Sequence, residues 1–250
     1  MFDSFEVSKL KNYLDLLPEM KAWAQFAPPG RFPLDLNNIT LTSSAVAVLL
    51  FPYESRLSTL LIVRSSHDKD KHSGQISFPG GKADDSDKDL VQTALRELWE
   101  ETGITLDESN FIGTLSSLAI PVSGFEVTPI VLYLDQLPGI TLSEQEAESY
   151  HILSLQQLSD ISHRKVMDMK RNENIILKDI PYIDLIEGTP LWGATAMILA
   201  ELLEWIKAVE PLEVKKSEVR NDSKNGQWCV LLELLLVVID LFDRTAFAIR

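Results

Sequence analysis

The sequence predicts an α/β protein in which a mixed β-sheet packs between helices. Apolar, β-rich runs and segments with helical periodicity follow one another along the chain without strict alternation. That order is typical of a mixed sheet rather than an all-parallel one. The chain has 250 residues, of which 45% are hydrophobic and 24% charged. This composition is ordinary for a globular protein, and the length suffices for a sizeable core in one or two domains.

The elements follow from the spacing of apolar residues. Residues 4–17 have apolar side chains at helical spacing, which predicts a short amphipathic helix before a loop rich in Pro and Gly at 28–33. The apolar runs 45–51 and 59–63 predict a strand pair joined by a turn at 52–58. Further strands are expected at 111–118, 127–134, 150–153, 165–169 and 175–180, and a final helix at 191–207.

The end of the chain differs in composition from the rest. Residues 208–228 are polar and charged and are expected to form a linker. Residues 230–242 are strongly apolar, but Glu233 and Asp240 interrupt them, and a membrane span needs about twenty apolar residues. A membrane-surface helix would need a basic face, so we expect a helix packed on the domain or on a second subunit. The expected division is therefore 1–39 (N-terminal helix and loop), 40–207 (main domain) and 208–250 (linker and apolar segment).

Charge and cysteine content exclude some classes of protein. The formal net charge of −14 argues against a nucleic-acid binder, which needs a basic surface. The single Cys229 excludes an intrachain disulfide and fits a reducing compartment. Residues 1–6 have neither the basic nor the apolar part of a signal peptide. We therefore expect a cytoplasmic protein.

The most informative segment is residues 80–104, which ends in the run RELWEETGI. On a helix, Glu97, Glu100 and Glu101 project from one face because they lie three and four residues apart. Gly103 is expected to end this helix in the left-handed conformation. Carboxylates in the last turn oppose the helix dipole and repel one another, each effect costing about 0.3–1 kcal/mol. Such glutamates often form only a solvated face, but a segment that accepts both penalties is suited to bind Mg²⁺ or Mn²⁺.

The flanking residues favour the metal-binding interpretation, because together they resemble the Nudix box. That pattern is Gly, five residues, Glu, seven residues, then Arg-Glu-aliphatic-x-Glu-Glu-x-Gly-aliphatic, and its second half matches from Arg96 to Ile104. The first half differs. Gly81 lies fifteen residues before Arg96 instead of fourteen, and Lys88 stands where the box has its first Glu.

The aspartates around Lys88 are expected to compensate for that difference. Asp87 and Asp89 flank Lys88, and either could pair with Arg96 in place of the missing Glu. Asp87 or Ser86 is expected to cap the helix N-terminus.

The offset of one residue is similar to the coenzyme A diphosphatase branch of the Nudix hydrolases. The segments that carry this resemblance are LLIVRS at 60–65, GQISFPGG at 74–81, TALRE at 93–97, GFEVTP at 124–129 and WGATA at 192–196. The resemblance spans roughly residues 40–205. It implies a Nudix-type α/β/α sandwich with a mixed sheet. It also implies a metal-dependent enzyme that cleaves coenzyme A or acyl-coenzyme A into 3′,5′-ADP and (acyl-)4′-phosphopantetheine.

Two other functions stay open at this point. One is a Nudix hydrolase of ADP-ribose or another nucleoside diphosphate derivative. The other is a non-catalytic Nudix-like nucleotide sensor, against which the complete set Glu97, Glu100 and Glu101 argues. In each case the expected partner is a small molecule rather than nucleic acid or membrane, and a homodimer is possible.

The resemblance also implies roles for individual residues. Glu97 and Glu101 are expected to bind the Mg²⁺ or Mn²⁺ directly, with Glu100 sharing the metal or acting through water and the Gly81 carbonyl completing the shell. Arg96 is expected to orient the loop carboxylates. A later loop should supply a base or an additional ligand. The candidates are Glu144, Glu146 and Glu148, of which Glu146 matches the family best although each is equally a solvated acid.

The cations and histidines near the box give a less specific signal. Arg64, His72, Gly80 and Gly81 are the expected substrate-binding residues. Each basic residue is equally a solvated surface cation, and the histidines outside this set are expected to be structural or to face solvent. The residues concerned are the cations Lys69, Lys71 and Lys82, which could meet phosphate groups, and the histidines His67, His151 and His163.

Overall fold

The computed structural model describes residues 7–34, 39–65, 74–172 and 175–223. The chain divides into two compact units, residues 1–206 and residues 207–250. All features below belong to the first unit unless stated otherwise.

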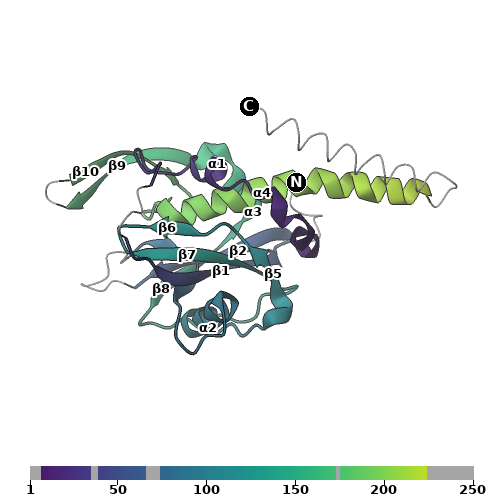
Figure 1. The fold of residues 1–250 in the computed structure, drawn as a ribbon, viewed down its shortest axis with the longest axis horizontal. Helices are drawn as coiled ribbons and strands as arrows, with labels where there is room; N and C mark the ends of the chain where they lie inside the picture. Colours follow the sequence, from purple (N-terminus) through teal and green to yellow (C-terminus); the bar gives the residue numbers. More distant parts are fainter. Residues whose placement is uncertain (1–6, 35–38, 66–73, 173–174, 224–250) are drawn as a thin grey trace. The chain divides into compact units, whose positions relative to one another are not determined.

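A mixed eight-stranded sheet forms the centre of the first unit (Figure 1). The predicted strand pair is confirmed, since β1 (Thr42–Tyr53) and β2 (Arg56–Arg64) run antiparallel across a turn at Glu54 and Ser55. β7 (Phe125–Tyr133) lies parallel to β1 on its other side, which makes the sheet mixed as predicted. The remaining strands are β3 (Ile76–Ser77), β4 (Gly80–Lys82), β5 (Phe111–Thr114), β6 (Leu118–Ile120) and β8 (Ala147–Ser154).

Helices cover both faces of this sheet, which confirms the predicted α/β/α sandwich (Figure 1). On one face, α2 (Leu90–Thr102) buries Ala94, Leu95 and Leu98 against alternate apolar residues of β1. On the other face lies the first part of α4 (Gly193–Ser223). Alternate burial on a strand is what places two apolar layers on the two sides of one sheet.

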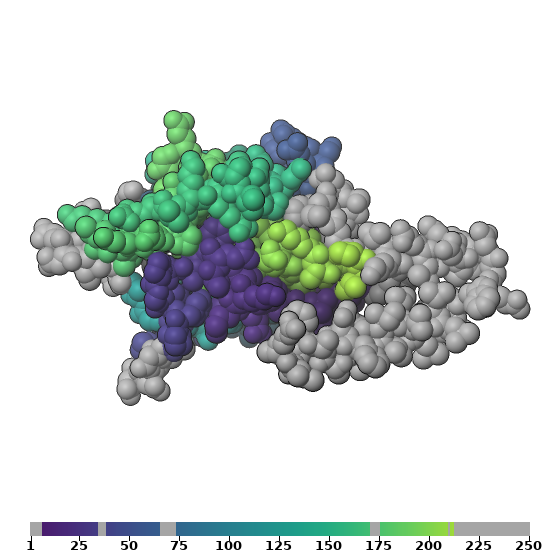
Figure 2. Space-filling model, turned by 90° about the horizontal axis from the view of Figure 1, so that it is seen from above, coloured from purple at the N-terminus to yellow at the C-terminus, as the bar shows by residue number. Residues whose placement is uncertain are grey.

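A second, three-stranded sheet and several short helices complete the first unit. The strands are β9 (Arg164–Asn172), β10 (Ile175–Ile183) and β11 (Leu191–Trp192). The short helices are η1 (Val7–Leu16), α1 (Met20–Trp23), η2 (Glu108–Asn110), α3 (Leu155–Ser159) and η3 (Ile161–His163). The N-terminal segment lies beside α4 (Figure 2), where Trp205 Nε1 donates to the carbonyl of Tyr13 at 2.8 Å.

The structure corrects several predicted boundaries. The predicted helix at 4–17 is a 3₁₀ helix over Val7–Leu16. The predicted strand at 111–118 is two strands, β5 and β6. Between them, the backbone N–H and the hydroxyl of Ser116 donate to the buried carboxylate of Glu201 instead of continuing a strand. The final helix begins after β11, at Gly193 rather than residue 191.

The predicted linker is also partly wrong. In the second unit α4 continues to Ser223, so residues 208–223 are helical. Charged composition alone does not separate a linker from a solvated helix, because Glu, Lys and Arg are good helix formers. The apolar run 230–242 lies outside the described residues. No described helix combines the length and the hydropathy that crossing a membrane requires.

Candidate active site

The helix that carries the glutamates has a cap at each end. At its start, the side chain of Asp89 accepts the backbone N–H of Gln92 at 2.9 Å. Asp89 is therefore the N-cap, and the prediction of Ser86 or Asp87 at this position was wrong. At its end, Gly103 adopts φ 71° and donates its N–H to the carbonyl of Trp99, as expected for a glycine C-cap. These caps set where α2 begins and ends.

Asp87 has the role that the missing glutamate of the box would fill. Its two oxygens accept Nε and Nη2 of Arg96 at 3.0 and 2.9 Å. This fork holds the pKa of the Asp87 carboxyl well below its usual range and raises the pKa of Arg96. Lys88 turns away and pairs with Glu108 at 3.1 Å. The aspartate beside Lys88 thus compensates for the offset in the sequence pattern.

The same guanidinium also holds the acids of the helix. Nη1 of Arg96 donates to Glu97 at 2.8 Å and to Glu100 at 3.0 Å. Its Nη2 donates to the carbonyl of Lys82 in β4 at 3.1 Å. Arg96 therefore links the aspartate-rich turn, the glycine strand and two glutamates, which agrees with the orienting role expected for it.

The glycines of β4 approach the glutamates closely. β4 pairs with the start of β1, and the N–H of Gly80 donates to Glu101 Oε2 at 2.8 Å. A Cβ added at Gly81 would lie 2.5 Å from the carboxyl carbon of Glu97. Only a residue without a side chain leaves the Glu97 carboxylate in place. The glycine pair therefore adjoins both central glutamates, and its predicted role in binding substrate stays a prediction.

Burial dominates the electrostatics of the two central glutamates. Glu101 is only 3% exposed, and burial raises its pKa to about 8, against the opposing effects of the Gly80 N–H and Arg64. Burial also raises the pKa of Glu97, against the effect of Arg96. Nearby carboxylates raise both pKa values further. Arg64 and Arg96 thus offset only part of the effect of burial on these two carboxyl groups.

One of the three loop candidates interacts electrostatically with this pair. Glu146 is the loop acid whose charge raises the pKa of both Glu97 and Glu101. It lies just before β8, whose Ala147 pairs with Arg64 at the end of β2. Of the three candidates, Glu146 is therefore the one whose charge acts on both central glutamates.

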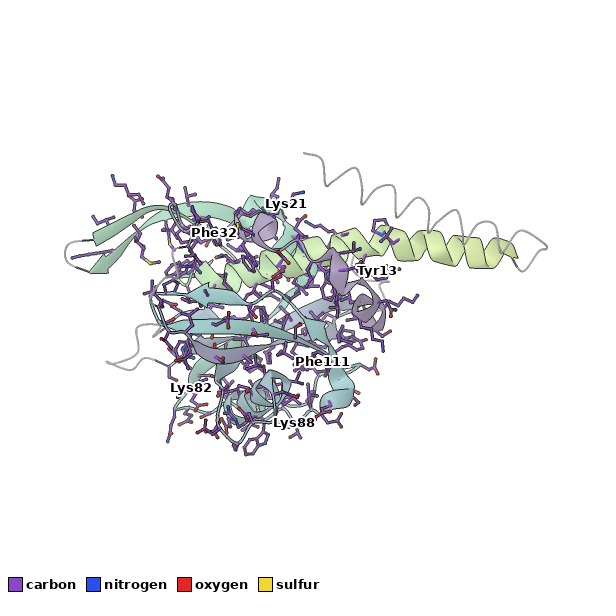
Figure 3. All side chains as sticks on the ribbon, viewed as in Figure 1. Tyr13, Lys21, Phe32, Lys82, Lys88 and Phe111 are labelled. Carbon is purple, nitrogen blue, oxygen red and sulfur yellow. The ribbon has the colours of Figure 1, made fainter. Side chains whose placement is uncertain are left out.

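Among the predicted cations, Arg64 and Lys82 lie at the site. Nη1 of Arg64 is 4.0 Å from Glu101 Oε1. Lys82 lies on the α2 side of the sheet (Figure 3). It lines an open depression of about 260 Å³ together with Asp84, Asp85, Arg96 and Glu97.

The other predicted cations and histidines are not among the described residues of the site. The described residues do not include His67, Lys69, Lys71 or His72. His151 lies on β8 opposite Leu61, and His163 lies in η3.

The donor set fits a hard divalent cation. In the described ranges, no group of three or more Asp, Glu, His or Cys residues forms a preformed metal cluster. Arg96 contacts both Glu97 and Glu100 instead. However, the buried Glu101 and the partly buried Glu97 have raised pKa values beside a glycine strand, and a divalent cation would remove this electrostatic cost. The residues that would hold it are Glu97 and Glu101, with Glu100 at the solvent side.

Sequence reasoning missed the residues that fasten the acidic loop. The N–H groups of Thr141 and Ser143 donate to the carbonyls of Thr102 and Glu101 at 2.9 and 3.0 Å. Ser65 holds the same loop from the end of β2. These are mostly backbone bonds between segments distant in sequence, and they leave no side-chain pattern. The Arg64-Ser65 pair in the family-like segment was the one available signal.

Comparison with known proteins identifies the family. The NUDIX domain family model matches residues 42–172. The uncharacterized Nudix hydrolase NudL of Yersinia enterocolitica is 34% identical over 161 residues, covering 64% of this chain and 80% of its own. NudL of Pectobacterium atrosepticum is 33% identical over 144 residues, covering 58% and 73%. A solved MutT/nudix family protein from Enterococcus faecalis aligns over 82% of this chain and 75% of its own, with 16% identity and a TM-score of 0.48. The chain belongs to the Nudix hydrolase family, whose members act on pyrophosphate bonds and use divalent metal ions.

Proposed function

We propose that this Nudix hydrolase cleaves coenzyme A or acyl-coenzyme A into 3′,5′-ADP and (acyl-)4′-phosphopantetheine. The supporting observation is the position of the GQISFPGG segment, residues 74–81, which is similar to the coenzyme A diphosphatase branch. In the structure its β3 pairs with β2 next to Arg64, and its Gly80 binds Glu101. The segment that carries the resemblance therefore adjoins the acidic site itself.

The proposed roles follow from charge and burial. Glu97 and Glu101 would hold Mg²⁺ or Mn²⁺, which supplies neutralisation of the phosphate oxygens and acidification of a water molecule. Glu146, exposed and facing both glutamates, accepts the proton of the attacking water. Arg96 keeps Glu97 and Glu100 in position through its bond to Asp87. Arg64, beside Glu101, is placed to attract an anionic phosphate.

The arrangement of acids also supports an enzyme over a nucleotide sensor. A protein that only binds a nucleotide gains nothing from three converging carboxylates, which repel phosphate and one another. The same carboxylates are useful when a cation must be bound and a water deprotonated. The alternative of an enzyme for ADP-ribose or another nucleoside diphosphate derivative differs only in the groups attached to the diphosphate.

Substrate preference tests the proposal. Purified protein with Mg²⁺ or Mn²⁺ should cleave coenzyme A with a higher kcat/KM than ADP-ribose or NADH, and chelator should abolish the activity. Dephospho-coenzyme A lacks the 3′-phosphate and should be about ten- to a hundredfold poorer, the effect of one lost charge-assisted contact. Faster cleavage of ADP-ribose would overturn the coenzyme A assignment, but the assignment as a Nudix hydrolase would stand.

A further inference from the structure

The charge of Glu146 contributes to the raised pKa values of Glu97 and Glu101, of which Glu101 is buried and Glu97 partly buried. Glu146 is exposed and follows an irregular segment, so nothing in its own side-chain packing confines it. Like charges at short range favour a loop position farther from the helix. Hydrogen bonds that fasten the backbone of this loop would hold the third carboxylate near the pair.

The first half of the loop is fastened to the end of α2. The carbonyls of Glu101 and Thr102 have no partner within the helix because they lie in its last turn. They accept the N–H groups of Ser143 and Thr141 at 3.0 and 2.9 Å. Inside the loop, the N–H of Glu146 donates to the carbonyl of Ser143 at 2.9 Å. These bonds connect the loop to the helix that carries Glu97 and Glu101.

The second half is fastened by one residue at the end of β2. Ser65 donates its backbone N–H to the carbonyl of Glu146 at 2.9 Å and its hydroxyl to the carbonyl of Glu144 at 3.0 Å. The two bonds lie on either side of residue 145 and together fix the direction of the chain at Glu146. The preceding residue, Arg64, reaches Glu101. Two consecutive residues, Arg64 at the end of β2 and Ser65 directly after it, thus contact the helix acid and the loop that bears Glu146.

We propose that Ser65 is a positioning residue, whose hydroxyl holds the 144–146 loop so that the Glu146 carboxylate faces Glu97 and Glu101. This inference rests on the proposed function, in which Glu146 accepts the proton of the attacking water. Ser65 acts on the reaction only through Glu146 and does not touch the substrate. Its removal must therefore affect kcat rather than KM, and only when Glu146 is present.

A double-mutant cycle tests this coupling, with coenzyme A as substrate and Mg²⁺ in excess. Ser65→Ala should lower kcat about two- to thirteenfold, the effect of one lost hydrogen bond of about 0.5–1.5 kcal/mol, and leave KM unchanged within error. In the Glu146→Gln background the same substitution should have no further effect on kcat. Ser65→Thr keeps the hydroxyl and should restore most of the activity. Ser159→Ala is the matched control, because the Ser159 hydroxyl also donates to a backbone carbonyl, that of Gln156 in α3, at 2.8 Å.

Three results would overturn the inference: an unchanged kcat in Ser65→Ala, a higher KM in place of a lower kcat, or an equal loss of kcat with and without Glu146. If Ser65→Ala unfolds, Ser65→Cys, which keeps the size but is a weak donor, takes its place in the same cycle. Normal turnover by Glu146→Gln would reject the proposed base and this inference together. A defective Glu146→Gln with a silent Ser65→Ala would reject the positioning role alone.

Discussion

Arg96 shows at the scale of single residues how the sequence pattern and the structure are related. The sequence offered Asp87 and Asp89 as its partners, and the structure uses Asp87 because Asp89 is needed as the helix N-cap. The choice between the two aspartates depends on where the helix begins, which is directly after Asp89. Residue types and spacing predicted that an aspartate pairs with Arg96, whereas the geometry of the helix cap decided which aspartate does so.

Replacing the central glutamates should separate activity from stability. Glu97→Gln and Glu101→Gln should each lower kcat/KM by about a hundredfold or more, because a ligand to the cation contributes several kcal/mol to transition-state stabilisation. In chelator, neither should lower the melting temperature, since each removes a buried charge with a raised pKa. Glu108→Gln, in an exposed ion pair with Lys88, is the control and should leave activity unchanged. Near-normal turnover of both site variants would contradict the ligand assignment.

The two adjacent glycines should respond differently to alanine. A Cβ at Gly80 would lie 2.4 Å from the carbonyl oxygen of Ala45, which cannot move aside, so Gly80→Ala should destabilise the fold by about 1–3 kcal/mol. At Gly81 the obstacle is the end of the Glu97 side chain, so Gly81→Ala should fold but displace this carboxylate and lower activity. Gly139→Ala has open space and is the control. Chemical denaturation and turnover measure the two effects, and full activity of Gly81→Ala would show that Glu97 does not need its position.

At the scale of elements, the hydrophobic pattern predicted the longer strands of the main sheet and the helix α4, but neither β3 nor β4 and not where each element stops. β5 and β6 were predicted as one strand because the apolar residues run on through 111–118. The break occurs at Ser116, which binds Glu201 of α4 some 85 residues later. A contact between elements so distant in sequence has no local signature. The extension of α4 to Ser223 was missed because a charged surface helix and a charged linker have similar compositions.

The buried Glu201 of α4 should make stability depend on pH. Burial raises its pKa above the ordinary value of 4.5, and the bonds from Ser116 and Trp23 offset only part of this. The unfolded chain therefore releases this proton at a lower pH than the folded chain does. The stabilisation is complete below the unfolded pKa and decreases as pH rises through the folded pKa.

Glu201→Gln should remove this dependence, because the amide does not titrate and still offers an oxygen to Trp23 or Ser116. The melting temperature of the variant relative to the wild type should therefore rise between pH 4.5 and pH 7. Exposed Glu187→Gln serves as the control and should follow the wild type across the range. If the relative melting temperature of Glu201→Gln fell over the same interval, the assigned pKa direction would be wrong.

At the scale of the whole molecule, the described residues proposed for the site all lie between Arg64 and Glu146, within the first compact unit. This explains why one dense motif and its flanking segments were enough to predict the centre of the site. The loop connections that position Glu146 could not be predicted, because they are made by backbone atoms brought together only by the sheet. The second unit contributes no residue to this set.

A chain that ends at Ala208 should therefore retain its catalytic activity. Its kcat and KM for coenzyme A should equal those of the full chain within error. The full chain, measured in parallel by turnover and by size-exclusion chromatography, is the reference. Loss of activity in a folded, truncated protein would show that residues 209–250 contribute to catalysis, whereas insolubility or a change of oligomeric state would assign them a packing role.

The most direct test of the account is the fate of coenzyme A in water labelled with heavy oxygen. With Mg²⁺ or Mn²⁺, the wild-type protein should produce 3′,5′-ADP and 4′-phosphopantetheine, with the label on one of the two products only, because a single water attacks a single phosphorus. Glu101→Gln should produce neither product at a comparable rate. Intact coenzyme A after prolonged incubation with active protein, or the same products at the same rate from Glu101→Gln, would contradict the central claim that this acidic site hydrolyses the diphosphate of coenzyme A.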